Sequence, residues 1–116
     1  MPRKSQKNSA DPPEPPEPRA PPEPADATWT FLSNHSHVLL LLAQEPSLRI
    51  RDLARRVAIT ERAVQKIIAD LEAAAILTRL KDGRRNRYLV HRDQPLRHPV
   101  EAHRTVDDLI RMVHDP

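Results

Sequence analysis

Apolar residues recur with helical spacing in two neighbouring stretches near the middle of the chain. The first stretch places its apolar residues at i, i+3, i+4 and i+7, the spacing of one buried helix face: Ile50, Leu53, Ala54 and Val57. The second stretch repeats the spacing, and Ala75 would continue it one turn later: Val64, Ile67, Ile68 and Leu71. The pattern predicts two short amphipathic helices, from about Ile50 to Val57 and over about 60–75.

A tight turn is expected between these helices. Thr60 is suited to cap the second helix, because its hydroxyl can accept a free backbone N–H of the first turn. Ile59 is apolar and can fill the angle between the helices. Such turns often carry glycine. If Ala58 must adopt a left-handed conformation, it costs about 1 kcal/mol relative to glycine.

Burial of the second stripe leaves a polar face on the second helix. The outward residues are Glu61, Arg62, Gln65, Lys66 and Ala69. A short helix that presents an Arg, a Gln and a Lys is suited to reading the major groove of DNA.

After Ala75 the period of the pattern changes from 3.6 to 2. The runs 77–81 and 84–90 predict two strands around Asp82-Gly83, a strong signal for a type I′ hairpin turn. The expected cross-strand pairs are Leu80 with Arg85, Arg79 with Asn86, and Leu77 with Tyr88. Apolar residues should anchor the base of this hairpin, namely Leu77, Tyr88, Leu89 and Val90, and the tip, KDGRRNR, is cationic.

A first helix should precede this region. We expect it to begin at about Asn34 or Ser36, either of which can cap it, and to end at Glu45 before Pro46. Its apolar face consists of Val38, Leu39, Leu41 and Leu42. Trp29 and Phe31 should cover the edge of the core or form a dimer contact.

A last helix is predicted over 100–113, after a connector broken by Pro95 and Pro99. Its stripe consists of Val106, Leu109, Ile110 and Val113. The stripe can pack on its own domain or against a second subunit. We expect a homodimer through these four residues, because a domain of this size buries only a small core.

Residues 1–27 contain nine of the thirteen prolines and almost nothing apolar. Such a segment cannot offset its ordering entropy, so we expect a disordered tail with polyproline II character. It is either a tolerated tail, a spacer, or a ligand for a protein with a proline-recognition groove.

In the order of its helices and hairpin, the chain resembles winged helix-turn-helix bacterial transcriptional regulators of the MarR-like and ArsR-like kind, over roughly Trp29 to Val90. The resemblance implies a mainly α fold with a small β-hairpin, plus a C-terminal amphipathic helix. The domains would be 1–27 (tail), 28–92 (winged helix) and 93–116 (linker and last helix). It also implies a brief strand at 46–48 that pairs with the hairpin through Leu48.

The resemblance further implies a sequence-specific regulator that binds double-stranded DNA. The helix over 60–75 would enter the major groove, with base-reading residues Thr60, Arg62, Gln65 and Lys66. The helix before it would contact phosphates through Arg49, Arg51, Arg55 and Arg56. The wing, 81–87, would contact the minor groove and backbone through Lys81, Arg84, Arg85 and Arg87.

The distribution of charge agrees with a polyanionic partner. The net charge is only +3, but residues 49–92 hold twelve Lys and Arg against five acids. A localised basic surface is typical of nucleic-acid binding. The alternatives are a solvated face, or a protein-interaction module that docks an acidic protein.

Other functions find little support in the sequence. With one glycine, no cysteine and no HExxH or GxSxG motif, we expect no enzyme, cofactor or metal. His35 and His37 lie about 200° apart on a helix and cannot chelate one ion there. The longest apolar run, 38–43, is too short for a membrane span, so we expect a cytoplasmic protein.

Overall fold

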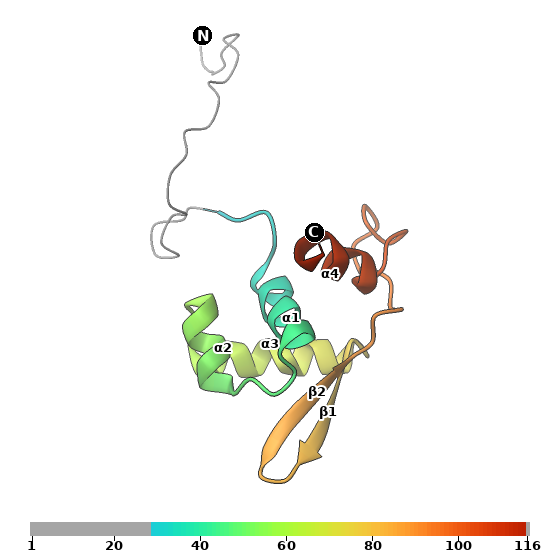
Figure 1. Ribbon diagram of the computed structural model, residues 1–116. Coiled ribbons are helices and arrows are strands. Elements are labelled where there is room, and N and C mark those ends of the chain that lie inside the picture. Colours follow the sequence, from blue (N-terminus) through green and yellow to red (C-terminus); the bar gives the residue numbers. More distant parts are fainter. Residues whose placement is uncertain (1–28, 116) are drawn as a thin grey trace, which may run out of the picture.

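The computed structural model describes residues 29–115, and the predicted proline-rich tail lies outside them. The described chain is mainly helical with one small antiparallel hairpin, as predicted (Figure 1). Its elements are α1 (Asn34–Gln44), α2 (Ile50–Val57), α3 (Glu61–Ala73), β1 (Leu77–Asp82), β2 (Arg85–Val90) and α4 (Val106–His114). None of the helices in this part of the chain is long and apolar enough to cross a membrane.

Helix α1 occupies the centre of the fold and contacts α2, α3, β2 and α4. Ser33 caps it by accepting a hydrogen bond from the Ser36 N–H (3.3 Å). The expected caps, Asn34 and Ser36, were therefore wrong, because both lie inside the helix. Leu40 is buried although it lies off the predicted stripe, since elements surround α1 on several sides. Leu41, predicted for that stripe, is only half-buried.

The turn between α2 and α3 has the predicted form. Helix α2 has the predicted bounds, and Ala58 adopts the left-handed conformation that was anticipated for it, with φ 65°. Ile59 packs against the core. The Thr60 side chain accepts a hydrogen bond from the Ala63 N–H (3.0 Å) and so caps α3 as expected.

Helix α3 ends before Ala75, which corrects the prediction that Ala75 would extend its stripe. Ala75 is left-handed, with φ 61°. Its N–H donates to the Glu72 carbonyl (3.0 Å), and the Ile76 N–H donates to the Leu71 carbonyl (2.9 Å). These two bonds form a Schellman motif, which ends the helix and turns the chain into β1.

The hairpin register differs from the predicted one. Leu77 pairs with Val90, Arg79 with Tyr88, Leu80 with Arg87, and Asp82 with Arg85. The turn residues are thus Gly83 and Arg84, and of these only Gly83 has a positive φ (66°). Positive φ at the first central position alone is what a type II′ turn requires, so the predicted Asp82-Gly83 type I′ turn was wrong. The shift moves each partner by two residues, so each side chain keeps its predicted face.

The base of the hairpin is anchored by Leu77 and Tyr88, which are buried, and Val90, which is half-buried. Leu89, predicted to join them, is 50% exposed because it lies on the opposite face of the strand. The 46–48 connector forms no strand in the described chain. Two of its carbonyls contact β2: Pro46 accepts from the Tyr88 N–H (3.0 Å), and Ser47 accepts from the Arg85 guanidinium (2.6 Å).

Helix α4 begins at Val106, six residues later than predicted, because Thr105 provides its cap. Thr105 and Asp108 exchange hydrogen bonds between their side chains and backbone N–H groups, at 2.9 and 3.2 Å. At the other end of the helix, the His114 Nε2–H donates to the Leu40 carbonyl of α1 (2.9 Å).

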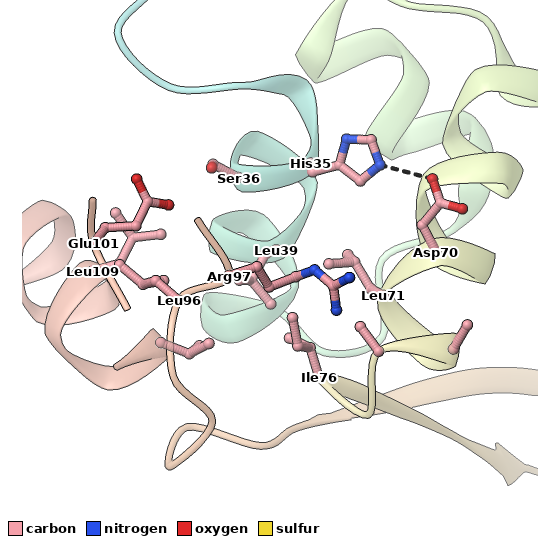
Figure 2. A pocket seen from close by; sticks show the side chains of 13 residues that line it. His35, Ser36, Leu39, Asp70, Leu71, Ile76, Leu96, Arg97, Glu101 and Leu109 are labelled. Atoms are coloured by element: carbon pink, nitrogen blue, oxygen red, sulfur yellow. Dashed lines mark hydrogen bonds and ion pairs between the residues drawn. The ribbon is translucent and has the colours of Figure 1, made fainter. Parts of the chain in front are cut away.

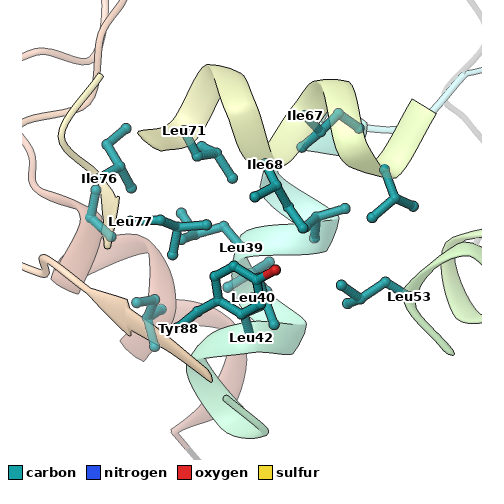
Figure 3. Packing of buried hydrophobic residues seen from close by; sticks show 14 of the residues in the cluster. Leu39, Leu40, Leu42, Leu53, Ile67, Ile68, Leu71, Ile76, Leu77 and Tyr88 are labelled. Carbon is teal, nitrogen blue, oxygen red and sulfur yellow. The ribbon is translucent and has the colours of Figure 1, made fainter. Parts of the chain in front are cut away.

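One hydrophobic core joins all these elements (Figure 3). Its buried residues are Val38, Leu39, Leu40, Leu42, Leu53, Ala54, Val64, Ile67, Ile68, Leu71, Ile76, Leu77, Tyr88, Val106 and Ile110. No polar or charged residue is buried in the described chain. Trp29 and Phe31 do not cover the edge of this core. They are 69% and 92% exposed and contact each other edge to face.

Candidate nucleic-acid interface

The polar face of α3 is on the surface, as the apolar stripe requires. Val64, Ile67, Ile68 and Leu71 are buried against the core. The five residues predicted to face outward are exposed: Glu61, Arg62, Gln65, Lys66 and Ala69. The candidate base-reading side chains therefore share one accessible helix surface.

These side chains differ in how they are held. Within residues 29–115, Arg62 and Gln65 form no side-chain hydrogen bond or ion pair. Lys66 is paired with Asp70 at 2.9 Å, and the Thr60 hydroxyl is used as the helix cap. An exposed i, i+4 pair contributes only about 0.3–0.5 kcal/mol, so Lys66 can exchange Asp70 for another acceptor at little cost.

Asp70 connects α3 to α1. One of its oxygens accepts from Lys66, and the other accepts from His35 Nε2 at 2.9 Å. The hydrogen bonds from His35 and then Lys66 hold the pKa of the Asp70 carboxyl below its ordinary value. His37 bonds instead to Asn34 (3.2 Å), so the two histidines point to different partners. The described residues contain no group of three or more potential metal ligands.

The four arginines of α2 and its N-cap are exposed, but they do not form one group. Asp52 accepts a hydrogen bond from the Arg49 backbone N–H (3.4 Å), and its carboxylate lies 3.7 Å from Arg55. Arg56 forms an ion pair with Glu45 at 2.8 Å, which directs it toward the end of α1. Arg49 lines a hollow beside the hairpin, whereas Arg56 lines a different hollow, next to Val57 and Trp29.

The structure brings Arg49 together with the tip of the hairpin. A hollow of about 230 Å³ lies between the start of α2 and the hairpin. Its lining residues are Ser47, Leu48, Arg49, Ile50, Arg84, Arg85, Asn86 and Tyr88. Arg49 and the adjacent Arg84 and Arg85, which follow it by 35 and 36 residues in sequence, thus line one small concave surface. Such a surface attracts anions.

Within this hollow, the side chains of Arg85 and Arg84 differ in whether they have a hydrogen-bond partner. The Arg85 guanidinium donates to the Ser47 carbonyl at 2.6 Å. Arg84 occupies the turn and has no side-chain partner among the described residues. The sequence pattern does not distinguish these two arginines, whereas the structure assigns a partner to Arg85 alone.

The other two hairpin cations lie on opposite faces of the sheet. Lys81 pairs with Asn86, on the face that carries Tyr88, and Arg87 pairs with Leu80, on the other face. The cationic tip therefore presents charge in two directions rather than as one row.

Sequence reasoning missed the connection between α3 and the hairpin. Arg79 of β1 donates two hydrogen bonds to Glu72 of α3, at 3.2 and 3.0 Å. The same guanidinium lies 5.9 Å from the centre of the Tyr88 ring. No motif marks residues 72 and 79 as partners, because their contact depends on how the chain turns at Ala75.

No family model matches the chain, and a search of curated proteins finds no match.

Proposed function

We propose that this chain is a winged helix-turn-helix regulator, similar to the MarR-like and ArsR-like kind, that binds double-stranded DNA by sequence. The observation that carries the proposal is the exposed polar face of α3, with Arg62 and Gln65 unpaired in the described chain. A helix of this kind fits the major groove, where an Arg reads guanine and a Gln reads adenine.

The surroundings of α3 support the proposal. The hollow at Arg49, Arg84 and Arg85 offers a second cationic contact, suited to phosphates or a narrow minor groove. Arg84 is the better candidate for insertion, because Arg85 would first have to release the Ser47 carbonyl. Arg51 and Arg55 remain candidates for phosphate contact. Arg56 is a weaker one, since Glu45 already neutralises it.

We further propose that DNA binding involves two copies of the chain. Val106 and Ile110 are buried within their own domain and are not available to a partner. Val113 (45% exposed) and Trp29 border a hollow of about 650 Å³, and Met112 and Phe31 are exposed as well. Exposed apolar side chains around one hollow suggest a contact with a second copy. Of the other residue predicted for this contact, Leu109, part of the side chain is also accessible, because it is only half-buried.

Selection of bound duplexes from a random library tests the function. We expect enrichment of a defined sequence, with affinity that falls steeply with salt. Measurement of mass in solution, with and without the selected duplex, tests the pairing of subunits. If no duplex is enriched and the chain binds a stable acidic protein instead, the interaction-module alternative replaces DNA binding.

A further inference from the structure

The proline-rich segment 11–26, which lies outside the described structure, places its acidic residues at a fixed spacing. Every third position from 11 to 26 is acidic except Ala20, and no other position of the segment is acidic. The acidic residues are Asp11, Glu14, Glu17, Glu23 and Asp26. Five acids against the single Arg19 give the segment a net charge of −4.

This spacing equals the period of polyproline II, the conformation expected for the segment from its prolines. That helix has three residues per turn and rises about 3.1 Å per residue, so the five carboxylates would lie along one edge. The eight prolines of the segment all occupy positions on the other two edges. A chain that is already extended loses little conformational entropy when it docks.

The segment joins the domain beside the end of α2. Trp29, three residues after Asp26, lines the same hollow as Arg56 and Ala58. At the other end of α2, Arg49 shares its hollow with Arg84 of the hairpin. Helix α2 therefore connects the entry point of the segment with the cationic hollow, over about 12 Å for its eight residues.

The outer surface of α2 offers positive charge along this path. Arg51 and Arg55 are exposed and four residues apart, so they lie on one side of the helix. Arg51 has no side-chain partner in the described chain, and the contact of Arg55 with Asp52 is long, at 3.7 Å. Both guanidinium groups can therefore accept another carboxylate.

The exposed face of α3 is less suited to an acidic edge. Lys66 is already compensated by Asp70, which also accepts from His35 (Figure 2). Glu61 is exposed on the same helix and would repel a carboxylate. Arg62 is the one cation of α3 without a partner in the described chain. The balance of charge thus favours a path along α2.

We propose that the acidic edge of residues 11–26 docks along α2, from Arg55 past Arg51 to the hollow at Arg49 and Arg84. The segment would be about 50 Å long as polyproline II, which is enough for this path. Each exposed ion pair contributes little, but the short connection at Trp29 makes the contact intramolecular, with an effective concentration in the millimolar range.

Docking of this segment should lower the affinity for DNA. It would cover arginines that the proposed function assigns to phosphate contact, so this consequence rests on the proposed function. The segment and the duplex would then compete for the same cations.

Two variants of the full chain separate the acidic edge from acidity in general. The neutralised variant carries Asp11→Asn, Glu14→Gln, Glu17→Gln, Glu23→Gln and Asp26→Asn. The redistributed variant keeps the composition and net charge but spreads the acids over all three edges. Its substitutions are Pro13→Glu, Glu14→Pro, Glu17→Pro, Pro18→Glu, Pro22→Glu and Glu23→Pro.

A spin label tests docking without DNA. The chain has no cysteine, so Pro16→Cys, away from the acidic edge, gives one labelled site. Docking along α2 places the label about 30 Å from Asp26, near Arg49 and the hairpin tip. We expect NMR line broadening of amides at 49–52 and 82–85, and little at 96–104, on the far side of α1 from α2 (Figure 1).

The broadening should depend on the acidic edge and on the arginines of α2. We expect it to fall at least threefold in both segment variants, in Arg51→Gln/Arg55→Gln, and at about 1 M salt, where charges are screened beyond about 3 Å. Arg104→Gln/Arg111→Gln, which removes two exposed arginines elsewhere, should retain it. Broadening confined to residues near Trp29, or unchanged in the redistributed variant, would overturn the docking.

A mixed sample identifies the copy that supplies the segment. In it, only unlabelled chains carry the NMR isotope, and only isotope-free chains carry the spin label. We expect no broadening in this sample. Broadening equal to that of the single-chain label would place the segment on a second copy and overturn the intrachain contact.

Duplex affinity is measured separately, with the duplex selected above. The redistributed variant should bind at least about threefold more tightly than wild type, as when the segment is docked in two-thirds of molecules. Because net charge is unchanged, loss of simple repulsion cannot explain that gain. Docking seen by NMR with equal duplex affinities would reject the link to DNA. Docking in chains that select no duplex would reject the proposed function and retain the contact.

Discussion

Arg79 on β1 donates two hydrogen bonds to Glu72, in the last turn of α3, and so joins the hairpin to the proposed recognition helix. Arg79 also sits opposite Tyr88 in the hairpin ladder, with its guanidinium 5.9 Å from the Tyr88 ring centre. Tyr88 is buried, so the ring beside the Arg79 guanidinium belongs to the core. The pair therefore restricts the angle between helix and hairpin.

A double-mutant cycle with Glu72→Gln and Arg79→Gln should reveal this coupling. The side chains are 29% and 46% exposed, so we expect a coupling of about 0.5–1 kcal/mol, the upper part of the range for accessible pairs. Chemical denaturation provides the measurement. Arg104 and Asp108, which are 4.0 Å apart and 66% and 43% exposed, form the control cycle, with coupling near zero. Equal coupling energies in the two cycles would mean that the two hydrogen bonds between Arg79 and Glu72 do not stabilise the fold.

Glycine at either left-handed alanine should stabilise the protein. Ala58 and Ala75 have φ of 65° and 61°, where an L side chain is strained and glycine is not. We expect Ala58→Gly and Ala75→Gly each to add about 1 kcal/mol, which corresponds to about 4–8 °C in Tm for a domain of this size. Thermal unfolding followed by circular dichroism measures this. Ala69→Gly, inside α3 and exposed, should destabilise by a similar amount. If all three variants lost stability, the left-handed alanines would not be strained.

The two arginines at the hairpin tip should contribute unequally to duplex affinity. Arg84 is free of side-chain partners among residues 29–115, whereas Arg85 already donates to the Ser47 carbonyl. We expect Arg84→Ala to weaken binding more than Arg85→Ala, and to lower the slope of log affinity against log salt by about 1. Fluorescence anisotropy at several salt concentrations measures both quantities, with Arg104→Ala as a control. Equal affinity in wild type and Arg84→Ala would remove the hairpin from the interface.

The helices were predictable because the spacing of their apolar residues reflects which face of each helix is buried. Ile50–Val57 has the predicted bounds, and the Thr60 cap and outward face of α3 also follow from residue type and spacing. The register of the hairpin was not predictable in this way. Pairings that differ by two residues keep every side chain on the same face, so the apolar pattern cannot distinguish them. Both candidate turns contain Gly83. The observed turn places Gly83 at the first central position, where its φ is positive.

Contacts between distant elements were the other part that the sequence did not reveal. The last helix was predicted to begin directly after Pro99, whereas the observed helix begins at Val106, where the apolar stripe starts and where Thr105 and Asp108 form the cap. Two ion pairs form only once the chain has folded, because neither joins residues that share a sequence motif: Glu72–Arg79 and His35–Asp70.

Protonation of Asp70 should lower the free energy of unfolding at acidic pH. Hydrogen bonds from His35 and Lys66 lower its pKa in the folded chain below the ordinary value of 3.8. A carboxyl with a lowered folded pKa contributes stability above its unfolded pKa and loses it as the pH falls through the folded value. We therefore expect Asp70→Asn to flatten the fall in unfolding free energy below about pH 4. Urea denaturation between neutral and low pH measures this, and Asp93→Asn, exposed and without an ion pair among the described residues, should retain the wild-type slope.

Gln65 should determine sequence preference rather than overall affinity. It is exposed on α3 and has no side-chain partner in the described chain, and its amide can both donate to and accept from one adenine edge. We expect Gln65→Ala to lose discrimination at one base pair of the selected duplex, by about 1–3 kcal/mol, while binding to mismatched duplexes changes little. Competition binding with every single-base variant of the duplex provides the measurement. Ala69→Ser, one turn further along the same exposed face, serves as the control. A uniform loss of affinity across all variants would place Gln65 on the phosphate backbone and remove α3 from base reading at that position.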